Sequence, residues 1–244
     1  MAMKILVTND DGIYSEGLEI LASWAKKLGD VTIVAPKTQQ SAKSHSINIH
    51  TPFEVKKFDW IKGVECYSVD STPADCIRFA FAGLHQNFDL VLSGVNKGYN
   101  LGEDIAYSGT DGAIFEAAYF KCNAIAFSTD FDTYEGSEPK IDAAYKYIID
   151  NNLFAYNNLY NVNYPTADSN GILFTKQGDA YFKDNFVEVG PNMYQAQGYS
   201  TYQNTQRLDQ DLDAVMNGYT SISPLTVNRT AKEAYEKLAK ILQK

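Results

Sequence analysis

The chain has 244 residues and a formal net charge of −9, with 45% apolar and 21% charged residues. This length and composition are typical of one globular domain with a full-sized core, and they do not require a second domain. The negative charge excludes a protein that coats a nucleic-acid duplex, because such a protein needs a basic face to displace phosphate counterions.

The first predicted element is a buried strand over residues 5–8, followed at once by Asn9, Asp10, Asp11 and Gly12. The apolar run lacks polar alternation, which is typical of a strand covered on both faces in a parallel sheet. Ligands of such sheets bind beyond the carboxyl ends of the strands. Two adjacent carboxylates repel each other near a dry core, so the pair indicates a hard divalent cation. The alternative is an Asx turn and a helix cap, for which one Asp would suffice.

The next segments alternate between helices and strands. Helices are predicted at residues 17–28, 72–84, 111–120 and 141–149, with Gly29 ending the first, and strands at residues 31–35, 66–69, 88–93 and 124–128. This alternation predicts a Rossmann-like, doubly wound, mostly parallel α/β sheet.

The composition changes after about residue 160, where Tyr, Asn and Gln become more frequent. Alternating segments at residues 186–189 and 193–196 flank Gly-Pro-Asn and predict a β-hairpin. Thr230 and Glu233 form a capping box that opens a last helix, whose apolar residues we expect to face inward. These apolar residues are Ala234, Tyr235, Leu238, Ile241 and Leu242.

The chain has neither a signal-peptide pattern nor an apolar run long enough to span a bilayer, so we expect a cytoplasmic protein without a membrane partner. Cys66, Cys76 and Cys122 show no disulfide framework and no metal-binding spacing, and we expect reduced structural thiols.

Three further loops at strand ends carry oxygen-bearing side chains. Residues 36–46 include Ser41, and residues 93–102 are rich in Gly and Asn, including Asn96 and Asn100. The spacing of the second loop matches neither a dinucleotide fingerprint nor a P-loop. Residues 107–110 place two hydroxyls around a glycine at a helix start, where free N–H groups can bind an anion.

Oxygen ligands for a hard metal beside an anion site indicate metal-assisted phosphoester hydrolysis. Asp10 and Asp11 are the expected metal ligands, and Asn100, Ser108 and Thr110 are expected to stabilise the equatorial phosphate oxygens. Among the dispersed histidines, only His45 is retained as a candidate substrate contact.

These residues resemble the SurE-type survival-protein nucleotidases, also described as acid phosphatases. The resemblance covers nearly the whole chain and is specific because several motifs occur together. The motifs are residues 5–12, residues 34–36 with Ser41, and residues 71–76, 93–102, 107–110 and 218–225. Ala42 departs from a glycine that many members have, and Leu212 departs from a frequent threonine.

The resemblance implies hydrolysis of nucleoside 5′- and 3′-monophosphates, and in some members of short polyphosphate. It implies one divalent cation per subunit, Mg²⁺ or Mn²⁺, bound by Asp10, Asp11, Ser41 and Asn96. The expected catalytic residues are Asp10, Asn100, Ser108 and Thr110, and the expected substrate contacts are Asn9, Ser41, Asn100, Ser108, Gly109 and Thr110.

The resemblance also implies a homodimer or tetramer formed by exchange of the C-terminal hairpin region. We therefore expect one domain, with a core over about residues 1–160 and 220–244 and an oligomerisation region over about residues 170–215.

Two alternatives from other classes stay open. A sensor would bind metal and nucleotide without releasing phosphate. A phosphatase of the haloacid dehalogenase type would form an aspartyl-phosphate, but it needs Asp-x-Asp after the first strand, whereas Asp10 and Asp11 are adjacent.

Overall fold

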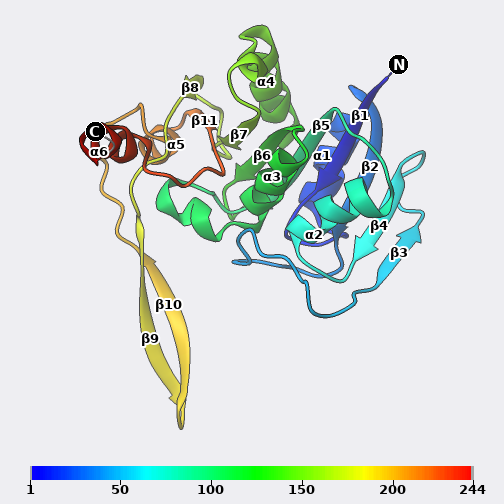
Figure 1. Ribbon diagram of the computed structural model, residues 1–244, viewed down its shortest axis with the longest axis horizontal. Coiled ribbons are helices and arrows are strands. Elements are labelled where there is room, and N and C mark those ends of the chain that lie inside the picture. The colour runs from blue at the N-terminus through cyan, green and yellow to red at the C-terminus, as the bar shows by residue number, and fades with distance from the viewer. Residues whose placement is uncertain (1, 243–244) are drawn as a thin grey trace.

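The structure is a computed structural model that describes residues 2–242 (Figure 1). The helices are α1 (Glu16–Ala25), α2 (Pro73–Arg78), α3 (Gly109–Tyr119), α4 (Ser137–Asp150), α5 (Asp211–Met216) and α6 (Lys232–Leu242). The strands are β1 (Met3–Thr8), β2 (Gly29–Pro36), β3 (Val55–Phe58), β4 (Glu65–Val69), β5 (Leu90–Lys97), β6 (Asn123–Thr129), β7 (Leu159–Asn163), β8 (Ile172–Phe174), β9 (Phe182–Gly190), β10 (Met193–Ser200) and β11 (Thr220–Pro224).

Nine strands form one sheet in the order β3-β4-β2-β1-β5-β6-β7-β11-β8. The adjacent strands β4, β2, β1, β5, β6 and β7 are parallel to one another. Strand β3 runs antiparallel to its neighbour β4, and β11 runs antiparallel to its neighbour β7. The strand order reverses direction at β1, which lies between β2 and β5. This arrangement confirms the predicted Rossmann-like, doubly wound, mostly parallel sheet.

Each face of the sheet has its own hydrophobic core. Ile5 and Val7 of β1 pack with α1 and α4, whereas Leu6 of the same strand packs with α2 and α3 on the opposite face. Because alternate side chains of a strand point to opposite faces, both faces must be covered for all three residues to be buried. The uninterrupted apolar pattern of β1 follows from this.

Several predicted element ends differ from the structure. The first helix ends at Ala25, and Gly29 is the first residue of β2, where a Cβ would lie 2.1 Å from the carbonyl oxygen of Met3. This glycine therefore allows close strand pairing and does not end the helix. The second helix ends at Arg78 and continues as a wider π-helical turn, Phe79–Gly83.

Strand β5 extends four residues beyond its predicted end at Ser93, to Lys97. Val95 is fully buried, and Asn96 pairs with Ser128 of β6 after a register shift. Asn96 therefore lies on the end of a strand and not in a free loop.

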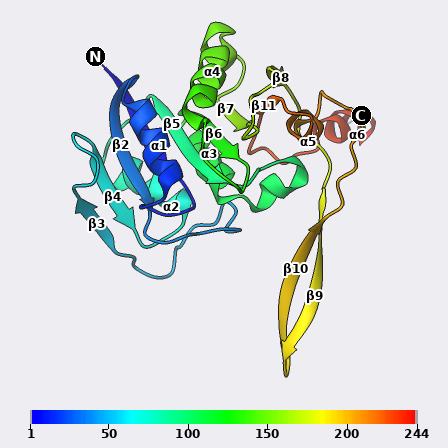
Figure 2. The ribbon, with the colours of Figure 1, turned by 180° about the vertical axis from the view of Figure 1, so that it is seen from behind.

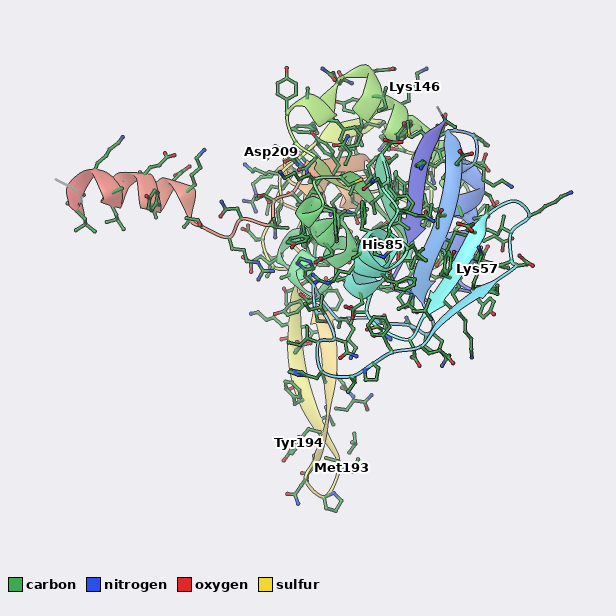
Figure 3. All side chains as sticks on the ribbon, turned by 45° about the vertical axis from the view of Figure 1, so that its right-hand side comes forward. Lys57, His85, Lys146, Met193, Tyr194 and Asp209 are labelled. Carbon is green, nitrogen blue, oxygen red and sulfur yellow. The ribbon has the colours of Figure 1, made fainter. Side chains whose placement is uncertain are left out.

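The predicted hairpin is confirmed and is longer than the sequence suggested. Strands β9 and β10 pair in antiparallel register and project from the rest of the chain, with Met193 and Tyr194 near the tip (Figure 3). Most of their side chains are exposed.

The prediction that the apolar face of the last helix points inward is wrong for this chain. No residue of α6 is buried, and the helix projects from the rest of the chain at the end of an extended segment (Figure 3). Figure 2 shows it on the side of the molecule that carries α5. Tyr235, Leu238, Ile241 and Leu242 are all exposed. Within residues 2–242, no helix has both the length and the apolar character needed to cross a membrane.

The three cysteines are buried free thiols, as expected. Burial raises the pKa of the Cys122 thiol to about 12, which keeps it protonated and unreactive at neutral pH.

Candidate functional site

A cavity of about 490 Å³ opens at the carboxyl ends of β1, β5 and β6. Six of the nine predicted site residues line it, namely Asp10, Asp11, Ser41, Asn96, Asn100 and Ser108. The topology brings these residues together because parallel strands end at the same edge of the sheet.

Asp10 is a buried residue of the cavity wall, directly after β1. Its carboxylate Oδ1 accepts a 2.6 Å hydrogen bond from the hydroxyl of Thr110. Burial raises the pKa of Asp10 to about 6, the charge of Asp11 adds to the rise, and the Thr110 hydrogen bond opposes it. The structure therefore holds a carboxylate whose charge is costly unless a cation lies beside it.

Gly109 lets helix α3 approach Asp10 closely. A Cβ at this position would lie 2.8 Å from the Cβ of Asp10 and 2.9 Å from its Oδ2. Thr110 is fully buried and its hydroxyl is committed to Asp10, so its side chain orients a carboxylate and does not face the cavity. This differs from the predicted direct contact between the Thr110 hydroxyl and phosphate.

Asp11 is partly buried on the other side of the turn. Burial raises its pKa, while the backbone N–H and the charge of Lys97 oppose the rise. The Lys97 ammonium lies 5.5 Å from the centre of the Tyr134 ring, and both residues line the cavity. Neither residue is predicted as a site residue from the sequence, because their proximity depends on the packing of two loops.

Asn9 has a different place from the one predicted. It is fully buried, and its amide nitrogen donates to the Gly12 carbonyl (3.1 Å) and to the Ser15 hydroxyl (2.6 Å). It is not among the residues that line the cavity. Asn9 therefore shapes the turn that presents Asp10 and Asp11.

Ser41 belongs to a loop that is anchored on α3. Its hydroxyl accepts a 3.0 Å hydrogen bond from Gln39, and Ser44 donates from its backbone to Tyr107 (3.0 Å). Ala42 has φ +58°, the left-handed conformation in which glycine is usual, so the departure from glycine noted in the sequence leaves this conformation in place.

Asn96 and Asn100 are held by hydrogen bonds to neighbouring residues. The Asn96 amide donates to the Gly98 carbonyl at 2.7 Å. The Asn100 amide donates to the hydroxyl of Ser128 at 2.8 Å, and Asn161 and Asn163 both donate to the Asn100 carbonyl. The side chains of β6 and β7 thus fix the loop that carries Asn100.

Ser108 caps helix α3, and its hydroxyl accepts from the backbone N–H of Asp111 at 3.0 Å. The first N–H groups of this 11-residue helix lie next to the cavity, where they favour an anion. Asp111 is fully buried, and neither of its carboxylate oxygens has a hydrogen-bond partner within residues 2–242. Burial raises its pKa to about 8, and the charges of Asp10 and Asp211 contribute.

His45 does not line the cavity and contacts Glu116 of α3 instead. The nitrogen Nε2 of His45 lies 2.7 Å from one Glu116 carboxylate oxygen, and Arg78 donates to the other at 3.0 Å. Burial alone would raise the pKa of Glu116, but His45 and Arg78 outweigh it and lower the pKa. His45 therefore anchors the Ser41 loop to the helix that carries Ser108.

The donor set fits a hard cation. Within residues 2–242, no three His, Cys, Asp or Glu side chains cluster as metal ligands do. Two carboxylates with amide and hydroxyl oxygens line the cavity, and such oxygen donors suit Mg²⁺ or Mn²⁺ better than a softer metal.

The fold and the site define an α/β protein with a doubly wound sheet and an acidic site beside a helix N-terminus at the strand ends. The model of the family "Survival protein SurE" matches residues 5–184. The chain belongs to this SurE family, which confirms the resemblance seen in the sequence.

Individual relatives are similar over nearly their whole length. The chain is 36% identical to the 5′-nucleotidase SurE of Clostridium beijerinckii, over 99% of this chain and 100% of the relative. It is 37% identical to the 5′-nucleotidase SurE of a Clostridium botulinum strain, over 93% of this chain and 94% of the relative. The crystal structure of the SurE protein from Aquifex aeolicus aligns with a TM-score of 0.78 at 31% identity, covering 98% of this chain and 99% of that one.

Proposed function

We propose that this protein is a metal-dependent phosphomonoesterase that hydrolyses nucleoside 5′- and 3′-monophosphates to nucleoside and phosphate, with short polyphosphate as a further substrate. The observation that carries this proposal is the position of Asp10, which lies against the first turn of α3 and next to Asp11. The curated relatives named 5′-nucleotidase support the 5′-monophosphate as substrate.

Asp10, Asp11, Ser41 and Asn96 are the residues that would hold one divalent cation, Mg²⁺ or Mn²⁺, in each subunit. When bound, such a cation neutralises phosphate charge and lowers the pKa of a water molecule at the site. Without a cation the two carboxylates repel phosphate, so the proposal requires metal for both binding and turnover.

The chain itself would position the phosphate. Gly109 and Thr110 open α3, and the backbone N–H groups of a first helical turn are free to bind an anion, here beside Ser108. Ser108 and Asn100 line the same cavity and can contact the phosphate oxygens. In the reaction, a water oxygen forms a bond to phosphorus while the bond from phosphorus to the ester oxygen breaks. Asp10, oriented by Thr110, keeps its charge next to the reacting phosphate.

Phosphate release from 5′- and 3′-nucleoside monophosphates, and from short polyphosphate, tests this function. The assay is run with EDTA, Mg²⁺ or Mn²⁺, on the wild type and on Asp10→Asn. We expect release that depends on metal and falls by at least about a hundredfold in the variant, whose fold is checked by circular dichroism. Saturable nucleotide binding without release would instead make the protein a nucleotide-binding module. A trapped phosphoenzyme would indicate aspartyl-phosphate chemistry.

We further propose that the protein forms a homodimer or tetramer in the cytoplasm through its C-terminal hairpin region. The exposed apolar residues of β9 and β10 support this, because a projecting hairpin with Phe186, Met193 and Tyr194 in solvent lacks a core of its own. The apolar face of α6 is also uncovered, and we propose that it takes part in the same contact between subunits.

A further inference from the structure

The ring of Phe131 is an exposed aromatic surface at the edge of the proposed active-site cavity. Phe131 is 68% exposed and lines the same cavity as Asp10 and Ser108. Single exposed apolar residues are common on protein surfaces. Phe131 differs from these in having a fixed position beside the cavity.

Two neighbouring loops fix this position. Asp130 accepts a 2.6 Å hydrogen bond from the Phe131 backbone N–H, and its other carboxylate oxygen accepts from the Tyr99 hydroxyl at 3.3 Å. The Gly98 backbone N–H also donates to the Thr129 carbonyl at 2.9 Å. These contacts join the loop after β6 to the loop after β5.

The Phe131 ring packs against Gly98. A Cβ added to Gly98 would lie 2.6 Å from two atoms of the ring, so the ring occupies the space that any other residue would need. The backbone thus supports the ring on one side, while most of its surface stays open to solvent.

A second aromatic residue, Tyr107, lines the same cavity beside the anion site. It directly precedes the helix cap Ser108, and it is 65% exposed. Its carbonyl accepts from the Ser44 backbone, which fixes its position next to the Ser41 loop. A phosphate bound at the N-terminus of α3 would place its ester group in the same cavity, whose wall includes Tyr107 and Phe131.

We propose that the base of a nucleoside monophosphate stacks on the Phe131 ring, with Tyr107 as a second aromatic wall; this inference rests on the nucleotidase function proposed above. Every nucleobase has a π-face, and stacking on an aromatic side chain tolerates any base. Because a phenyl ring offers no hydrogen bonds, Phe131 favours substrates that carry a base but discriminates weakly among bases.

The test compares two substrates that differ only in the base, 5′-AMP and ribose 5-phosphate. We expect Phe131→Ala to lower kcat/KM for 5′-AMP by about five- to tenfold, the lower end of measured base–aromatic stacking, because the ring is largely exposed. The same variant should change kcat/KM for ribose 5-phosphate less than about twofold. Phe131→Tyr keeps the aromatic face and should restore the preference for 5′-AMP.

Tyr156→Ala is the matched control, because Tyr156 is 85% exposed and does not line the cavity. It should leave both substrates unaffected. An equal loss for both substrates in Phe131→Ala would assign the residue to loop structure and overturn the proposal, as would no loss for either.

A failure of the nucleotidase function would be visible separately, because the wild type would then release phosphate from neither ester. In that case, the dissociation constant of 5′-AMP, measured by calorimetric titration, still tests whether the base stacks on Phe131. A dissociation constant raised at least about fivefold by Phe131→Ala supports it, and an unchanged affinity or no binding by the wild type overturns it.

Discussion

The hydroxyl of Thr110 donates a 2.6 Å hydrogen bond to the Asp10 carboxylate, joining two residues that are 100 positions apart in the chain. The bond connects the end of the first strand to the first turn of α3. It gives the proposed metal ligand one fixed orientation in a site where burial disfavours its charge.

Thr110→Val tests this relationship. The valine has the same shape but leaves the buried Asp10 carboxylate without its donor, so its pKa should rise further and it should bind a cation less well. We expect Mn²⁺ affinity to fall by about tenfold or more, measured by electron paramagnetic resonance of free Mn²⁺. Thr110→Ser keeps the hydroxyl and should stay near the wild type, whereas unchanged affinity in Thr110→Val would refute the orienting role.

The raised pKa of Asp111 leads to a prediction of how the stability of the protein depends on pH. Its folded pKa is raised to about 8, whereas an unfolded aspartate titrates near pH 4, so the folded state binds the extra proton between these values. The contribution of Asp111 to the free energy of unfolding should therefore decrease as pH rises from about 4 to 8.

Asp111→Asn removes this titration and keeps the size of the side chain. We expect the melting temperature of the metal-free variant to exceed that of the wild type at pH 8 by at least about 3 °C, with a smaller difference at pH 5. Scanning calorimetry across this range checks the prediction. Asp132→Asn, at an exposed position, serves as the control. Parallel pH profiles of the melting temperature for Asp111→Asn and wild type would contradict the prediction.

Glu116 should contribute to stability through its bonds to His45 and Arg78. Glu116→Gln keeps the size but removes the charge, and we expect the free energy of unfolding at pH 7 to fall by about 1–3 kcal/mol. The matched control is Glu138→Gln, which removes an exposed pair with Lys27 and should cost less than about 1 kcal/mol. Urea denaturation measures both.

The sign of the pH effect differs from that at Asp111. The folded pKa of Glu116 is lowered, so its contribution is complete above the unfolded pKa and is lost as pH falls through the folded pKa. The difference between Glu116→Gln and wild type should therefore shrink in acid. A constant difference down to pH 3 would show that the charge is not responsible.

Helix α6 provides the test of assembly. Leu238→Glu with Ile241→Glu places two charges on its exposed apolar face, and we expect the proposed oligomer to shift to a monomer in light scattering. Lys240→Glu changes the net charge by the same amount on the same helix and should leave assembly intact. An oligomer that survives the double substitution would show that this face does not hold the subunits together.

The sequence alone determined the core sheet, and most of the site residues that it predicted line the candidate site. The apolar run before Asp10 can be buried only if both faces of its strand are covered, and the alternation of helices and strands leaves few other topologies. Asp10, Asp11, Asn96 and Ser108 follow strands or open a helix, so their convergence at one edge was predictable.

Only the tertiary structure decided what each side chain contacts. Thr110 faces Asp10 because packing between α3 and β1 sets its direction, which sequence spacing does not encode. Asn9 closes a local turn, which the sequence offered only as the alternative to a ligand site. Tertiary packing also decides that Phe131 lies on Gly98, where two loops meet, and that His45 of a loop contacts Glu116 of helix α3. Helix α6 failed the inward prediction for a related reason, since an amphipathic pattern indicates that a face will be covered but not by what.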